Sequence, residues 1–173
     1  FLISYIYDML KNKEKQVLSK LIRNGRKTDK QIAKEIGTTQ PTVTRIRQKL
    51  EKEKYIRQYN ASPSFEKIGF NIVVITIMRW KDYSKQKPLA DFIKNIKNNT
   101  SVICFARGNG LSGRTAYFIS THKDMKSYED FIVDIKTKWG EYIDSTDQFI
   151  SSVENVFKHF DYSDVACKVL DEE

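Results

Sequence analysis

The first third of the chain places apolar residues at helical spacing, interrupted by glycine and polar residues. The segment 17–22 has apolar side chains at i, i+1, i+4 and i+5, which predicts a helix with one apolar face. Asn24-Gly25 follows, a pair that commonly ends helices. A first helix is therefore expected to end near residue 24 and to pack on a core through this face.

Two further helices are predicted, separated by the turn at residues 37–40. Thr28 offers an N-cap and Gln31 follows three residues later, the spacing of a reciprocal capping box. This second helix should stop at Gly37. Thr39 is the next N-cap, and Pro41 lies in the first turn, where its missing N–H has no cost. Two helices joined by so short a turn predict a helix-turn-helix.

The third helix, expected to run to about Lys54, has two different faces. At about 100° per residue, Val43, Ile46 and Leu50 fall on one side and should face a small core. The opposite side carries types that read base edges, since arginine pairs with guanine, glutamine with adenine, and the threonine methyl packs on thymine. This side comprises Pro41, Thr44, Arg45, Gln48 and Lys52.

Charge is divided unevenly along the chain. Of the net charge of +8, residues 1–69 carry 16 Lys and Arg against 7 Asp and Glu, whereas residues 70–173 carry 14 against 15. A basic segment beside a neutral one indicates a head that binds a polyanion. Lysine bias from an AT-rich genome is the alternative, although such bias should affect both parts alike.

The residues expected to contact double-stranded DNA lie on the third helix and around the two helix N-termini, where free N–H groups favour phosphate. The set is Arg26, Lys27, Lys30, Thr39, Gln40, Pro41, Thr42, Thr44, Arg45, Gln48, Lys49 and Arg57. For the basic members, a solvated charge on an ordinary amphipathic helix is the alternative.

Beyond the third helix the pattern changes to that of an α+β domain. Residues 55–59 read as a short wing-like strand, and residues 60–69 as a linker. Strands are then predicted at 71–80, 102–107, 114–121 and 148–160, with helices from Pro88 to Asn99 and from Tyr128 to Trp139. This is the ferredoxin-like βαββαβ order. The expected domains are a head at 1–59, a body at 70–160 and a C-terminal extension at 161–173.

These segments resemble a known family. The runs 16–26, 32–37 and 42–51 are similar to a winged helix-turn-helix head, and with the βαββαβ body they resemble the leucine-responsive/AsnC (feast/famine) regulators over about residues 14–157. The head motif also suits MarR-like regulators. The resemblance implies a transcription regulator that forms a dimer or higher oligomer through its bodies. It also implies pseudo-palindromic operators and, often, a response to amino acids.

The chain departs from that family where an effector would bind. Members that sense amino acids commonly carry Gly-Asp between the second and third body strands, whereas here Asn109 follows Gly108 and no acid precedes Arg114. Without that carboxylate, an anionic ligand held by Arg107, Gly108, Asn109, Ser112 and Arg114 is one interpretation. A glycine-rich hairpin that binds no ligand is the other.

Other functions have little support in the sequence. His122 and His159 are the only histidines, Cys104 and Cys167 form no CxxC pair, and there is no GxGxxG motif or P-loop. We expect no enzyme, no cofactor and no metal. Two cysteines without a disulfide framework indicate a cytoplasmic protein. No membrane partner is expected, because the apolar stretch 1–6 is too short to span a bilayer. The rival functions are a metabolite-sensing interaction protein and an architectural DNA binder without sequence preference.

Overall fold

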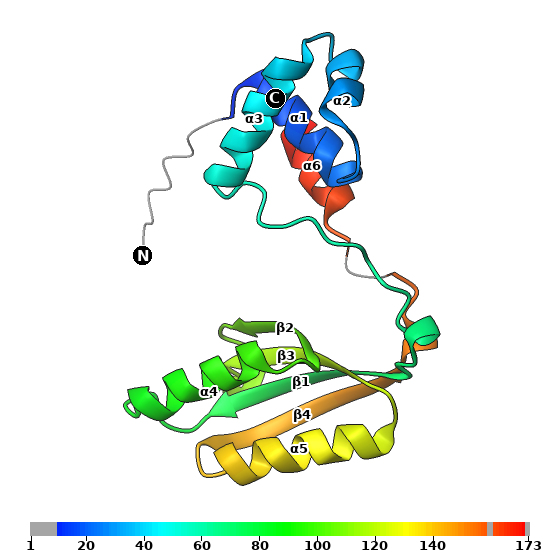
Figure 1. The fold of residues 1–173 in the computed structure, drawn as a ribbon. Coiled ribbons are helices and arrows are strands. Elements are labelled where there is room, and N and C mark those ends of the chain that lie inside the picture. Colours follow the sequence, from blue (N-terminus) through cyan, green and yellow to red (C-terminus); the bar gives the residue numbers. More distant parts are fainter. Residues whose placement is uncertain (1–9, 159–160, 172–173) are drawn as a thin grey trace. The chain divides into compact units, whose positions relative to one another are not determined.

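The computed structural model describes residues 10–158 and 161–171, which form two compact units (Figure 1). The head combines the described residues up to Ser62 with those from Lys158 onward, and the body spans Pro63–Phe157. The head therefore ends inside the linker expected at 60–69. The sequence also predicts a helix at the N-terminus that packs either on a partner subunit or on the chain's own core. Its apolar residues lie outside the described ones: Phe1, Leu2, Tyr5, Ile6 and Met9.

Three helices of the head follow the predicted pattern, and their apolar faces meet in one core. They are α1 (Asn12–Arg23), α2 (Asp29–Glu35) and α3 (Gln40–Lys52). The side chains that no solvent reaches are Val17, Ile32, Val43 and Leu50. Because the apolar face of each helix contributes to this core, packing stabilises even α2, which is only 7 residues long.

A further helix, α6 (Ser163–Asp171), completes the head from the other end of the chain. It packs along α1, where Cys167 is fully buried and the Ser19 hydroxyl donates to its sulfur at 3.4 Å. Leu170 lies against the head core. Residues 161–173 were expected to be an extension outside both domains; in the structure their described part belongs to the head.

The strand expected at residues 55–59 does not form. The backbone bends at Tyr55 and Ile56 and then runs on outside any strand or helix. Ile56 N–H donates to the Leu50 carbonyl at 3.1 Å, so the chain folds back on the end of α3. A β-prone segment needs a partner strand, and the described part of the head contains none.

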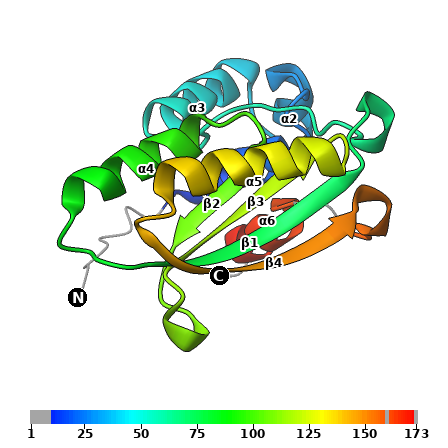
Figure 2. The same ribbon diagram turned by 90° about the horizontal axis from the view of Figure 1, so that it is seen from below.

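The body is a four-stranded antiparallel sheet in the order β2-β3-β1-β4. Its strands are β1 (Ile72–Trp80), β2 (Val102–Arg107), β3 (Ala116–His122) and β4 (Ile143–Ser152). The helices α4 (Gln86–Asn98) and α5 (Met125–Trp139) lie side by side over one face of the sheet (Figure 2). Met78, Phe92 and Phe118 are buried between these two layers. The predicted ferredoxin-like arrangement is confirmed.

The last strand begins and ends earlier than the predicted 148–160. β4 starts soon after α5 and pairs with β1 from Trp80↔Ile143 to Ile72↔Ser152. The β1 partner ends there, and the short 3₁₀ helix Val153–Asn155 follows. β4 is an edge strand whose residues are mostly exposed on both faces, so it lacks the apolar alternation on which the prediction depended.

Candidate nucleic-acid interface and ligand groove

Both ends of α2 are built as the sequence predicts. Thr28 and Gln31 form the reciprocal capping box, with Gln31 N–H 3.3 Å from the Thr28 hydroxyl and Thr28 N–H 2.9 Å from Gln31 Oε1. Gly37 has a φ of +63°, which an L side chain rarely adopts, and Thr38 N–H then donates to the Ala33 carbonyl at 2.9 Å. This geometry ends α2 and starts α3 within four residues.

The two faces of α3 are those predicted, except that Thr44 is half-buried. Val43, Ile46 and Leu50 are buried in the head core. Pro41, Arg45, Gln48 and Lys52 are exposed. A row of polar side chains on one exposed helix, free of carboxylates until Glu51, suits the major groove of DNA.

The expected DNA-contacting residues divide into two groups. Most are exposed: Arg26, Lys30, Thr39, Gln40, Pro41, Arg45, Gln48 and Arg57. Thr42 is half-buried, with its hydroxyl 2.9 Å from that of Thr39.

The remaining three already have partners within the head. Lys27 Nζ lies 2.6 Å from Glu35 Oε1, and Lys49 Nζ lies 2.9 Å from Glu14 Oε1. The hydrogen bonds from Lys27, and then from Lys20, hold the pKa of Glu35 below its usual value. A DNA phosphate would compete with these carboxylates for both lysines.

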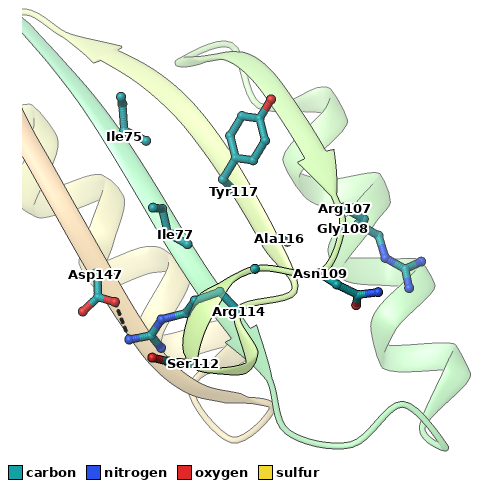
Figure 3. A pocket seen from close by; sticks show the side chains of 11 residues that line it. Ile75, Ile77, Arg107, Gly108, Asn109, Ser112, Arg114, Ala116, Tyr117 and Asp147 are labelled. Atoms are coloured by element: carbon teal, nitrogen blue, oxygen red, sulfur yellow. Dashed lines mark hydrogen bonds and ion pairs between the residues drawn. The ribbon is translucent and has the colours of Figure 1, made fainter.

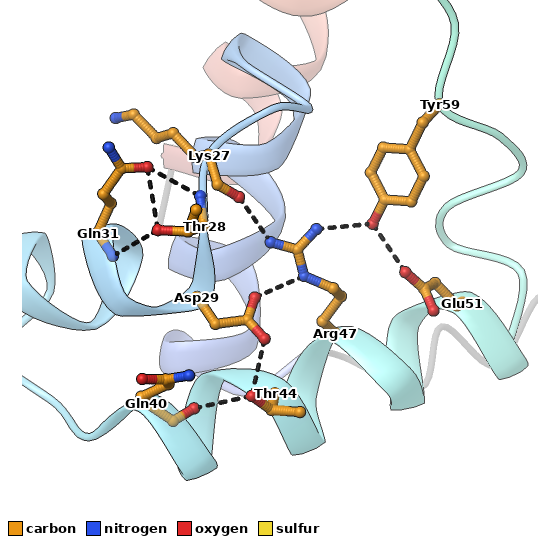
Figure 4. Close-up of polar contacts among 9 residues, drawn as sticks. All are labelled: Lys27, Thr28, Asp29, Gln31, Gln40, Thr44, Arg47, Glu51 and Tyr59. Carbon is orange, nitrogen blue, oxygen red and sulfur yellow. Dashed lines mark hydrogen bonds and ion pairs between the residues drawn. The ribbon is translucent and has the colours of Figure 1, made fainter.

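Thr44 is the third, and it leads to two residues that the sequence reasoning missed. Its hydroxyl donates to Asp29 Oδ2 at 2.7 Å, and Asp29 Oδ1 accepts from Arg47 Nε at 2.7 Å (Figure 4). Burial alone would lower the pKa of Arg47, but its bonds to Asp29 and Tyr59 raise it above the usual range. The only sequence signal for this pair is the position of its two members. Asp29 is the first residue of α2, and Arg47 lies one turn after Val43 on α3.

The body contains a groove of about 510 Å³ beside the β2–β3 hairpin (Figure 3). Its lining includes all five residues expected to bind an effector: Arg107, Gly108, Asn109, Ser112 and Arg114. Ile75, Ile77 and Tyr117 provide an apolar wall. The hairpin is closed by Gly110 N–H, which donates to the Arg114 carbonyl at 2.7 Å.

The two arginines of the groove differ in orientation. Arg114 forms an ion pair with Asp147 and a hydrogen bond with Ser145, both on β4. Arg107 points away from Arg114 (Figure 3). Its guanidinium lies 5.7 Å from the centre of the Tyr83 ring. Asp147 thus provides the carboxylate that the hairpin sequence lacks. No sequence signal identifies it, since it lies 33 residues after Arg114.

The sheet face opposite the two helices is apolar and open. Ile75, Ile77, Tyr117 and Phe149 are between 36% and 66% exposed on it. The register places Ile75 opposite Phe149 and Ile77 opposite Tyr117, so these side chains are contiguous. A patch of this kind commonly marks a protein–protein contact.

Metal-binding and membrane-spanning features are absent from the part of the chain that the structure describes. No group of three or more His, Cys, Asp and Glu side chains there is placed to hold a metal ion. None of the helices in the same ranges is both long enough and apolar enough to cross a bilayer.

Comparison with known proteins agrees with this geometry. Residues 10–57 match the family model of winged helix-turn-helix DNA-binding domains. A search of curated proteins finds no significant match.

Solved structures match nearly the whole chain. AsnC of Escherichia coli is 15% identical with a TM-score of 0.72, and the match covers 88% of this chain and 97% of that one. LrpC of Bacillus subtilis is 19% identical with a TM-score of 0.69, covering 88% and 98%. A transcriptional regulator of Neisseria meningitidis, solved with L-Met, is 17% identical with a TM-score of 0.73, covering 87% and 94%.

The fold thus defines a class, a helix-turn-helix head joined to a βαββαβ body. Within that class, the chain has the fold of the AsnC and leucine-responsive transcription regulators.

Proposed function

We propose that the protein is a transcription regulator that binds double-stranded DNA in a sequence-specific manner and acts in the cytoplasm. The observation that carries the proposal is α3, which buries Val43, Ile46 and Leu50 and exposes Arg45 and Gln48. The confined positive charge of residues 1–69 supplies the sequence-independent part of the affinity. Because the similar proteins are transcription regulators, an enzyme is not the role we expect.

The open apolar face of the sheet supports assembly through the body. Exposed Ile75 and Phe149 lose contact with water when a second copy covers them, and burial of apolar surface gives about 25 cal/mol per Å². A symmetric dimer then presents two α3 helices. Its half-sites should lie about one helical turn apart, or a multiple of that.

The groove supports modulation by a small zwitterion. Arg114 can hold a carboxylate, Asp147 can hold an ammonium group, and Ile77 lies beside both for an apolar side chain. A zwitterionic ligand is therefore proposed in place of the purely anionic ligand that the hairpin sequence alone suggests. One similar regulator was solved with L-Met, which has these three features.

A salt titration of binding to random duplex DNA tests the function. A regulator that neutralises several phosphates gives a steep negative slope of log affinity against log salt. A metabolite-sensing protein whose head docks on another protein gives almost none. Footprinting on the same DNA separates the architectural binder, which protects the duplex evenly, from a regulator that protects paired half-sites.

A further inference from the structure

Arg47 joins three parts of the head. Besides its bond to Asp29, its Nη2 donates to the Lys27 carbonyl at 2.8 Å, at the turn before α2. Its Nη1 lies 3.5 Å from the Tyr59 hydroxyl, and the guanidinium is 5.9 Å from the centre of that ring (Figure 4). Arg47 is not on the exposed polar face of α3, so its side chain links elements of the head to one another.

Tyr59 docks the connection to the body onto the head. It lies three residues before Ser62, where the head ends, and its hydroxyl donates to Glu51 Oε1 at 2.9 Å. A Cβ at Gly25 would be 3.1 Å from the Tyr59 ring, so the glycine lets this ring approach the turn after α1. Burial, with the bond to Glu51, raises the pKa of Tyr59, and the hydroxyl remains a donor at neutral pH.

The same network reaches the base-reading face. Asp29 accepts from Arg47 with one oxygen and from Thr44 with the other. The Thr44 hydroxyl also lies 3.1 Å from the Gln40 carbonyl. These two contacts hold the rotamer of Thr44, and so set where its methyl group points.

Resting on the DNA-binding function proposed above, we propose that Tyr59, Arg47 and Asp29 are positioning residues that set the sequence discrimination of α3 through Thr44. Discrimination depends on the orientation of base-reading side chains, whereas affinity for the backbone depends mainly on charge. Loss of the Tyr59 hydroxyl contacts with Arg47 and Glu51 therefore lowers the preference for the correct DNA sequence and leaves binding to random DNA nearly unchanged.

The test uses the full chain and two duplexes of equal length, one selected by the wild-type protein from a random pool and one of random sequence. Tyr59→Phe keeps the ring and removes the hydroxyl. We expect the ratio of the two affinities to fall by about fivefold, the value of one hydrogen bond, with less than a twofold change on random DNA. Tyr162→Phe is the matched control, because Tyr162 is 73% exposed, and it should leave both affinities unchanged.

A double-mutant cycle tests the path through Asp29. If Tyr59 acts through Arg47 and Asp29, then Tyr59→Phe causes no further loss of discrimination in an Asp29→Asn background, once circular dichroism shows both proteins folded. A wild-type ratio in Tyr59→Phe, or equal losses on both duplexes, overturns the inference alone. If the wild-type protein selects no sequence from the pool, the proposed function fails and the inference fails with it.

Discussion

Lys49 on α3 donates a hydrogen bond to Glu14 on α1, with 2.9 Å between Nζ and Oε1. Glu14 is 8% exposed, and Lys11 N–H also donates to it at 3.0 Å. The bond from Lys49, outweighing burial and aided by Lys11, lowers the pKa of this carboxyl. Lys49 therefore fastens the expected reading helix to the first helix of the head.

Replacing Lys49 should affect stability more than DNA binding. Lys49→Ala leaves the buried Glu14 carboxylate without its main partner, and we expect a loss of about 1 kcal/mol in the free energy of unfolding. Because the folded pKa of Glu14 is below its ordinary 4.5, the stabilisation is present above that pH and is lost as the pH falls through the folded value. Urea unfolding at pH 7 and across that acidic range measures both effects.

The control for this variant is Lys13→Ala, since Lys13 is exposed on α1 and should change neither stability nor its pH dependence. The salt slope on random DNA should fall by less than the roughly one unit expected of a phosphate contact. A pH-independent destabilisation would contradict the role assigned to the pair with Glu14, and a full unit of slope would return Lys49 to the DNA contacts.

Arg45 is expected to read a base. It is exposed on α3, and Arg45→Ala should cost about 1–3 kcal/mol on the selected duplex and relax the preference at one position. Arg26→Ala is the comparison, because a backbone contact weakens all sequences alike. Fluorescence anisotropy on single-base variants of the duplex measures this, and equal losses on selected and random DNA would remove Arg45 from base reading.

The sequence predicted those elements that bury a regular apolar stripe. The third helix was placed correctly because Val43, Ile46 and Leu50 repeat at helical spacing and meet one core. β4 was misplaced because an exposed edge strand has no such stripe, and its bounds depend on pairing with β1. The packing of α6 on α1 was missed because it brings Cys167 beside Ser19, a contact that no local pattern encodes.

In the candidate sites too, residues that are close in the sequence could be predicted together, whereas their distant partners could not. The hairpin that contains Arg107 and Arg114 is contiguous in the sequence, so its residues were found together. Asp147 reaches Arg114 only through the sheet register, in which it stands opposite Ile77. The pairing of Lys49 also depends on a distant residue, Glu14 on α1. The positive charge of a lysine in the sequence does not reveal an acid on a neighbouring helix.

The Arg114–Asp147 pair predicts a ligand preference in the groove. Asp147→Asn keeps the shape but removes the negative charge that would face an ammonium group, so the affinity for L-methionine should fall by about tenfold. Asp144→Asn, on the same strand but outside the groove, should have little effect. Isothermal titration measures both, and tighter binding of a simple anion than of L-methionine would restore the purely anionic ligand.

The open sheet face predicts the surface of assembly. Phe149 is 66% exposed, and Phe149→Asp places a charge among Ile75 and its apolar neighbours, which should shift the protein toward monomers. Val133→Asp is the control, because Val133 is 61% exposed on α5, across the sheet from that face. Sedimentation equilibrium distinguishes the two, and a Phe149→Asp protein that assembles like wild type would exclude this face.

His122 should make the body sensitive to mild acid. It is 3% exposed, with Nε2 2.9 Å from the Ser120 hydroxyl, and its ring packs on Phe131 and Tyr128. Burial lowers its pKa, so the folded body holds it neutral while the unfolded chain protonates it near its ordinary 6.5. The stability that neutral His122 contributes is then fully present above pH 6.5 and is lost as the pH falls toward the pKa of the folded state. His122→Gln retains a partner for Ser120 and does not titrate, so its unfolding free energy should vary less with pH across this window, even if it is lower at pH 7. Equal slopes in the two proteins, measured by chemical unfolding followed through tryptophan fluorescence, would mean that another group causes the acid sensitivity.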